Sequence, residues 1–178
     1  MKRFSENIPS NVPQHWDLTL ILDNLRSAHN VGNILRIAEA LQLKVIACGY
    51  TPASPHPVLA KTAMQCDVLV DCRSANSAAE AIKLVRSEGC RMVLALEHNS
   101  VSSEVWSYPK FDMPMALVLG NEALGIAEET LAEVDGFVAL PMFGEKSSIN
   151  VGNAAAAILY AILARTRMES AKAGEKNI

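Results

Sequence analysis

Side chains suited to chemistry follow three apolar runs of the sequence. Glu97 comes directly after one run, and Glu122 lies in the segment GNEALG after another. Ser148 and Asn150 lie in the loop after a third. Each run is short and apolar, as a strand buried in a parallel sheet is. Since ligands of such sheets bind beyond the carboxyl ends of the strands, we expect these loops to meet at one edge and form a binding site.

The common nucleotide-binding and nucleophile motifs are absent from the sequence. There is no G-x-G-x-x-G after the first apolar run, no G-x-x-x-x-G-K-[ST] and no G-x-S-x-G turn. The four histidines show no H-x-x-x-H spacing and the four cysteines form no C-x-x-C pair. The sequence therefore argues against a dinucleotide oxidoreductase and an NTPase, and it predicts neither a metal site nor a disulfide.

Arg36 is a charged residue inside a predicted amphipathic helix. The helix spans about 31–41, and Asn30 is expected to cap its start. Arg36 lies off the apolar stripe, which by itself is typical of a solvated charge. The residues of the expected buried stripe are Ile34, Ile37, Ala38 and Leu41.

Apolar runs alternate with helical patterns along the rest of the chain. Further helices are predicted from Ser77 to a stop at Gly89, near Ala127, and from Asn150. This alternation predicts an α/β fold with an open, mostly parallel sheet and helices on both faces. The predicted strands are 18–22, 44–48, 68–70, 91–96, 115–119 and 137–140.

The last helix carries almost no charge between residues 151 and 163. It is therefore expected to be apolar around most of its circumference and to need cover on two sides. The four alanines at 154–157 are expected to leave a nearly flat surface that a second copy of the chain approaches. The sequence predicts a homodimer on this basis.

The chain has 178 residues, of which 50% are hydrophobic and 20% charged, and this predicts one domain with a full core. Residues 1–16 are expected to form an irregular arm and 166–178 a tail. Neither a membrane span nor a signal peptide is recognisable, so a cytoplasmic protein is expected. The net charge of −3 argues against nucleic-acid binding by bulk electrostatics alone, although it allows a local basic patch at the ends of the chain.

Three segments carry the polar residues discussed above. They are NLRSAHNVGNILRIAEAL at 24–41, LVLGNEALGI at 117–126 and LPMFGEKSSINVGNAAAAILY at 140–160. Together they resemble the three motifs of the SpoU/TrmH branch of the SPOUT RNA methyltransferases, and the resemblance covers 17–165. It implies methyl transfer from S-adenosylmethionine to a ribose 2'-hydroxyl. It also implies a C-terminal deep trefoil knot, in which the segment 136–165 is threaded through a loop.

The resemblance also assigns roles to individual residues. Arg36 matches the catalytic arginine of the family, and its planar fork suits the binding of phosphate and ribose oxygens. Whether Arg36 also removes the hydroxyl proton stays open, because a guanidinium has a pKa above about 12 and must first lose a proton to another group. The residues that the resemblance places in the catalytic site are Asn30, Arg36, Glu122, Ser148 and Asn150.

The implied cofactor is S-adenosylmethionine, held largely by backbone groups in the knotted loops. Glycine at position 120 is expected because a side chain there would block the approach of the ligand. The implied cofactor-binding residues are Leu96, Gly120, Leu140, Met142 and Ile149.

The implied partners are an RNA substrate and a second copy of the chain, since family members are dimers whose sites use both chains. Transfer RNA is favoured over ribosomal RNA because a small domain suits a compact substrate. Two alternatives to an RNA methyltransferase stay open. The first is a non-catalytic RNA-binding protein, against which the matching site residues argue. The second is a methyltransferase that acts on small molecules.

Overall fold

The computed structural model describes residues 16–175, in which seven strands form a single sheet. The sheet order is β3-β2-β1-β6-β4-β7-β5, and every neighbouring pair is parallel. The predicted open parallel α/β sheet is thus confirmed. The strands are β1 (Leu18–Asp23), β2 (Lys44–Cys48), β3 (Cys72–Ala75), β4 (Met92–Leu96), β5 (Ser103–Glu104), β6 (Met115–Leu119) and β7 (Gly136–Ala139).

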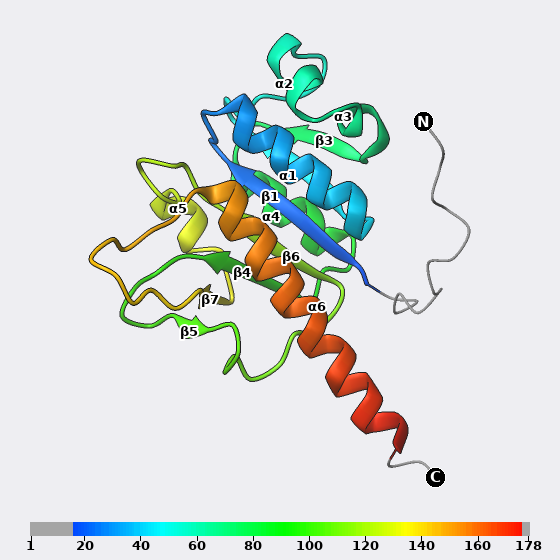
Figure 1. Ribbon diagram of the computed structural model, residues 1–178, viewed down its shortest axis with the longest axis vertical. Coiled ribbons are helices and arrows are strands. Elements are labelled where there is room, and N and C mark those ends of the chain that lie inside the picture. The colour runs from blue at the N-terminus through cyan, green and yellow to red at the C-terminus, as the bar shows by residue number, and fades with distance from the viewer. Residues whose placement is uncertain (1–15, 176–178) are drawn as a thin grey trace.

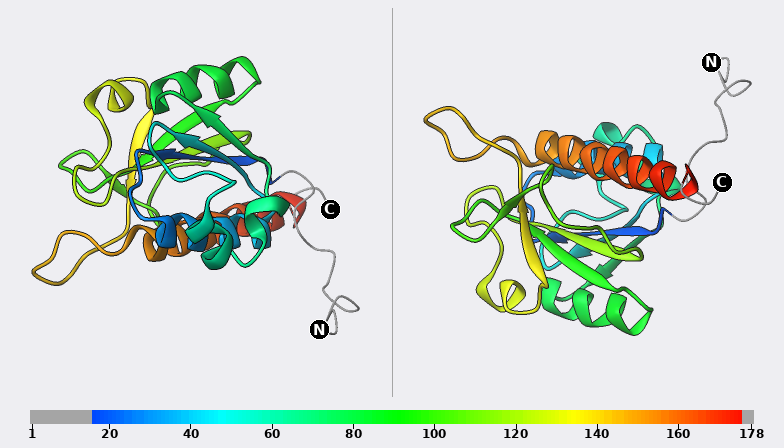
Figure 2. Two further views of the ribbon diagram at one scale, coloured as in Figure 1. Left: turned by 90° about the horizontal axis from the view of Figure 1, so that it is seen from above. Right: turned by 90° about the horizontal axis from the view of Figure 1, so that it is seen from below.

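Helices cover both faces of the sheet (Figures 1 and 2). One face is covered by α1 (Ala28–Leu41) and α6 (Val151–Glu175), which pack side by side, while α2 (Pro57–Thr62) and α3 (Cys66–Leu69) pack beside α1. The other face is covered by α4 (Ala78–Ser87) and α5 (Glu128–Leu131). Two buried clusters follow from this arrangement, one for each face of the sheet.

Two local predictions were wrong. The strand predicted at 68–70 is instead the end of α3, and β3 begins at Cys72. The short run of three apolar residues does not distinguish a strand from a helix, and Val68 is 73% exposed. Helix α1 begins three residues earlier than predicted, because Ser27 rather than Asn30 caps it by accepting a 3.3 Å hydrogen bond from the amide of Asn30.

Helix α6 also differs from the prediction. It continues through 166–175, where a tail was expected, while the predicted arm lies outside the described residues except for Trp16. The four alanines do not share a surface, because successive helical residues turn by about 100°. Ala155 is buried in the core, whereas Ala157 is exposed. Between residues 151 and 165, the exposed residues of α6 form a different stripe, which consists of Asn153, Ala157, Tyr160 and Ala164.

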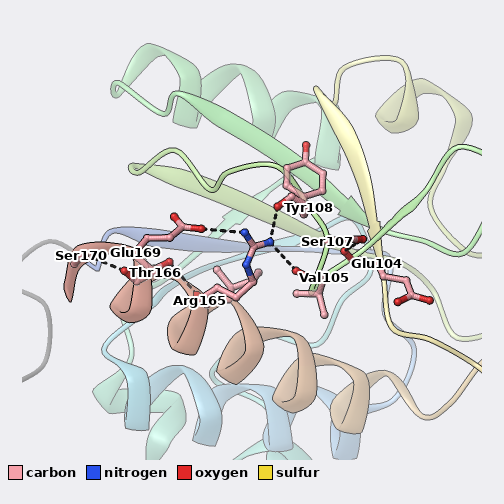
Figure 3. A network of polar contacts seen from close by, with 9 residues as sticks. Glu104, Val105, Ser107, Tyr108, Arg165, Thr166, Glu169 and Ser170 are labelled. Carbon is pink, nitrogen blue, oxygen red and sulfur yellow. Dashed lines mark hydrogen bonds and ion pairs between the residues drawn. The ribbon is translucent and has the colours of Figure 1, made fainter. Parts of the chain in front are cut away.

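Arg165 ties α6 to the loop between β5 and β6 (Figure 3). Its Nη1 donates hydrogen bonds to the carbonyl oxygens of Val105 and Tyr108, and its Nη2 donates to Glu169 at 2.9 Å. The guanidinium also lies 5.2 Å from the centre of the Phe111 ring. The sequence left open whether basic residues near the C-terminus form a patch, and these contacts show that Arg165 instead packs and hydrogen-bonds within the fold.

We expect Arg165→Ala to lower the free energy of unfolding by about 1–3 kcal/mol, because two backbone carbonyls lose a charged donor. Urea denaturation measures this change. The matched control is Glu169→Ala, which removes only the ion pair between neighbouring turns of the helix and should cost about 0.5 kcal/mol or less. Equal losses in the two variants would contradict the role of Arg165 as an anchor of the loop.

Candidate active site

A pocket of about 600 Å³ lies at the carboxyl ends of three neighbouring strands. Leu96 at the end of β4 is aligned with Leu119 of β6 and Val138 of β7, so the loops after these strands start at one level. All three loops line the pocket, together with the start of α6 and Asn30 of α1. The expectation that these loops meet at one edge of the sheet is therefore confirmed.

The pocket is suited to a small organic ligand in size and lining. Its volume lies within the usual range of about 300–1,000 Å³ for such sites. Apolar side chains line much of it, and the carboxylates of Glu97 and Glu122 add negative charge, which favours a ligand with a cationic group. All five residues expected to bind a cofactor line this pocket, namely Leu96, Gly120, Leu140, Met142 and Ile149.

The structure gives a reason for glycine at position 120 in addition to the expected approach of a ligand. A Cβ atom there would lie 2.6 Å from the carbonyl carbon of Gly125 and 2.6 Å from a side-chain carbon of Ile126. It would thus collide with the turn that follows β6. Glycine at this position allows that turn to fold back on the end of the strand, and the turn then forms part of the pocket wall.

Three predicted site residues form one chain of hydrogen bonds. The side-chain amide of Asn30 donates to Glu122 at 2.7 Å, and the amide of Asn150 donates to the Asn30 oxygen at 2.9 Å. The oxygen of Asn150 in turn accepts hydrogen bonds from the backbone amides of Gly152 and Asn153 at the start of α6. These hydrogen bonds therefore join α1, the loop after β6 and the start of α6, and they fix the relative positions of these segments around the pocket.

Glu122 also holds the start of α1. Its two carboxylate oxygens accept hydrogen bonds from the backbone amides of Arg26 and Ser27 at 3.0 and 3.2 Å. Burial acts to raise the pKa of the Glu122 carboxyl, but the hydrogen bonds from Arg26, Asn30 and Ser27 together outweigh it and hold the pKa below its ordinary value of 4.5. Glu122 is therefore ionised at neutral pH.

We expect Glu122→Gln to lower the free energy of unfolding at pH 7 by about 1 kcal/mol, a typical cost of losing a helix-capping acceptor. The amide nitrogen of glutamine would face a backbone donor instead of accepting from it. Because the folded-state pKa of Glu122 is depressed, its stabilising effect is present above pH 4.5 and is lost as the pH falls through the folded-state pKa. Urea denaturation at pH values from 7 down to 3 should show the unfolding free energies of wild type and Glu122→Gln converging in acid. A difference in unfolding free energy that does not change with pH would contradict this account.

The sequence did not single out the residues that support the turn after β6. The side-chain amide of Asn121 donates to the carbonyl oxygen of Asn24 at 2.6 Å and to the hydroxyl of Tyr50 at 2.9 Å. Its oxygen accepts from the amides of Ala123 and Leu124. Asparagine in a G-N-E sequence after a strand is a turn signal, and it could have directed attention to this residue.

The structure separates Arg36 from the other predicted catalytic residues. Ser148, Asn30, Glu122 and Asn150 line the pocket, whereas Arg36 does not. Arg36 is exposed on α1, about 9 Å farther along the helix axis than Asn30 and on another side of the helix. It forms no hydrogen bond or ion pair with any residue in 16–175. One chain by itself therefore assembles four of the five predicted catalytic residues.

Within residues 16–175, no group of three or more His, Cys, Asp or Glu side chains is placed to hold a metal ion. None of the helices there has the length and hydropathy of a membrane span. All four cysteines are free thiols, and burial raises the pKa of Cys48 to about 12.

Comparison with known proteins gives consistent matches. A family model described as the SpoU rRNA methylase family matches residues 17–160. The tRNA (guanosine(18)-2'-O)-methyltransferase of Thermus thermophilus is 32% identical over 145 residues, which are 81% of this chain and 73% of that protein.

Two solved structures extend the comparison. The SpoU methyltransferase AviRb from Streptomyces viridochromogenes, in complex with the cofactor AdoMet, matches with a TM-score of 0.76 and 27% identity over 89% of this chain and 64% of that one. A structure that concerns the 2-OH methylation of C/U34 on tRNA matches with a TM-score of 0.72 and 25% identity over 82% and 93% of the two chains. This likeness implies the C-terminal knot that the sequence led us to expect.

Proposed function

The chain belongs to the SpoU family of S-adenosylmethionine-dependent RNA 2'-O-ribose methyltransferases, and we propose that it methylates a ribose 2'-hydroxyl of transfer RNA. The observation that supports this best is the pocket, because residues of the three segments that resemble the family motifs converge on it. Asn30, Glu122 and Asn150 lie far apart in the sequence, yet they form one hydrogen-bonded chain there.

Transfer RNA is favoured over ribosomal RNA by the length of the matching proteins. The chain covers 93% of the structure that concerns methylation on tRNA, but only 51% of the 23S rRNA (uridine(2479)-2'-O)-methyltransferase of Streptomyces viridochromogenes. The relative from Thermus thermophilus, which is covered over 73% of its length, is also named as a tRNA enzyme. A cytoplasmic site of action agrees with this substrate and with four free thiols.

The pocket residues fit S-adenosylmethionine. When bound, this cofactor supplies an electrophilic methyl group. Leu140 and Met142 would contact its apolar parts, while the carboxylates of Glu97 and Glu122 would balance its positive charges. Ser148 lies on the pocket wall and makes no hydrogen bond within residues 16–175, so its hydroxyl is available to the ribose.

Three of the predicted catalytic residues have a positioning role in this proposal. The carboxylate of Glu122 already accepts three hydrogen bonds from the protein. The side-chain amide of Asn30 is used in both directions, since it donates to Glu122 and accepts from Asn150. We therefore propose that the hydrogen bonds among Asn30, Glu122 and Asn150 align the motif segments. Contact with the ribose and its phosphate is assigned to Ser148 and Arg36.

Arg36 enters the reaction through a homodimer in which it completes the pocket of the partner subunit. On α1 it is exposed one turn beyond Asn33. Asn33 lies against the start of α6, since a Cβ atom on Gly152 would be 3.4 Å from the Cβ atom of Asn33. The exposed stripe of α6 begins at the next residue, Asn153. Asn33 thus lies between Arg36 and this stripe, and we infer that the surface they share is where a second copy pairs.

The substrate is tested with purified protein, labelled S-adenosylmethionine and RNA from cells that lack this protein. We expect label in the tRNA fraction and at a single 2'-O-methylated nucleotide after digestion. Labelling of ribosomal RNA alone would reject tRNA as the substrate, while labelling of neither RNA would reject RNA methylation.

A further inference from the structure

Two large apolar side chains lie exposed beside the pocket. Phe143 is 96% exposed and directly follows Met142, which lines the pocket. Leu124 is 83% exposed and lies between Ala123 and Gly125, which also line it. The two residues come from the loops after β7 and β6, and each is adjacent in sequence to residues that line the pocket, although neither lines it itself. We call Phe143 and Leu124 the rim residues.

The loop that carries Phe143 extends away from the body of the protein (Figures 1 and 2). Every residue from 143 to 150 is exposed, and a Cβ atom on Gly144 would meet no atom within 4 Å. No residue in 16–175 therefore covers the ring of Phe143. Exposing such a ring is unfavourable in water, so its position beside the pocket points to a ligand that covers it.

The position of the rim identifies that ligand. The methyl donor fills the pocket, so the accepting ribose must lie at the mouth, where it reaches the methyl group. The base attached to that ribose then extends past the mouth to the rim. A base has an apolar face of similar size to a phenyl ring, and aromatic side chains bind unpaired RNA bases by stacking on that face.

We propose that Phe143 stacks on the base of the target nucleotide, or on the base next to it, and that Leu124 packs against the opposite side of that nucleotide. This inference rests on the proposed function and assigns its substrate contacts. Lys146 supports it, because it lies three residues after Phe143 and forms no ion pair within residues 16–175. Its ammonium group is available to an RNA phosphate. The aromatic ring of Phe143 and the positive charge of Lys146 lie on one short loop, and proteins bind single-stranded RNA with this combination of stacking and charge.

Substitution of Phe143 tests the inference. We expect Phe143→Ala to raise the KM for tRNA by about tenfold or more, which is the usual loss when one stacking contact is removed. Affinity for S-adenosylmethionine, measured by calorimetry, should stay unchanged. Phe143→Tyr should retain the wild-type KM because it keeps the ring, while Phe143→Leu should behave like alanine because it keeps apolar area without a ring.

Trp106→Ala is the matched control, since Trp106 is a 56% exposed aromatic residue whose chain neighbours, unlike Met142 beside Phe143, do not line the pocket. It should leave the KM for tRNA unchanged. A wild-type KM in Phe143→Ala, or equal defects in both variants, would overturn the inference while leaving RNA methylation by the wild type intact. Conversion of Phe143→Ala to a monomer would also overturn it, because the ring would then belong to the subunit interface.

Discussion

Arg36→Lys is expected to lose methyl transfer by about 100-fold or more in single-turnover assays with saturating tRNA. Lysine keeps the positive charge and the helix propensity, but it cannot hold phosphate and ribose oxygens with a planar fork. Fold and cofactor affinity should survive, since Arg36 is exposed and lies outside the pocket of its own chain. A lysine variant with the wild-type single-turnover rate would show that Arg36 supplies charge alone.

Mixed dimers determine which pocket Arg36 serves. Arg36→Ala is combined with a chain carrying Leu140→Arg, which places a bulky cation in the cofactor pocket. If Arg36 acts on the pocket of its partner, the mixed dimer contains one complete site and recovers methyl transfer although each variant alone is inactive. If no activity returns, Arg36 acts within its own chain and the proposed dimer geometry is wrong.

Tyr160→Arg is expected to convert the dimer into a monomer and to reduce methyl transfer by about 100-fold or more, because the pocket then lacks the partner's guanidinium. Tyr160 is 53% exposed in the middle of the α6 stripe, so an arginine there is tolerated by the single chain but not inside an interface. Sedimentation and calorimetry should show a folded monomer that still binds S-adenosylmethionine.

The matched control for this experiment is Leu84→Arg. Leu84 is a 37% exposed apolar residue on α4, which covers the opposite face of the sheet. The same charge introduced there should leave both the dimer and the activity intact. A Tyr160→Arg protein that remains an active dimer would place the subunit interface elsewhere.

Much of the fold could be predicted because each central strand is a short, mostly apolar run. β2 and β6 have the predicted bounds, and β1 extends the predicted strand by one residue. The prediction failed at 68–70, because three apolar residues contain too little periodicity to separate a strand from a helix. It also failed for the alanines of α6, where neighbours in the sequence point to different sides of the helix.

The sequence by itself determined the parallel sheet, the edge where the loops meet and the residue types at the site, because burial and strand direction follow from local patterns. Only the tertiary structure decided which of those residues hydrogen-bond to one another and which stay exposed to a substrate or partner. The contacts from Asn30 to Glu122 and from Asn150 to Asn30 span 92 and 120 residues of the chain. The exposure of Arg36, and of Phe143 at the rim, likewise depends on which distant segments pack nearby. Spacing along a chain carries no information about such contacts, since they form only when the sheet brings separate loops together.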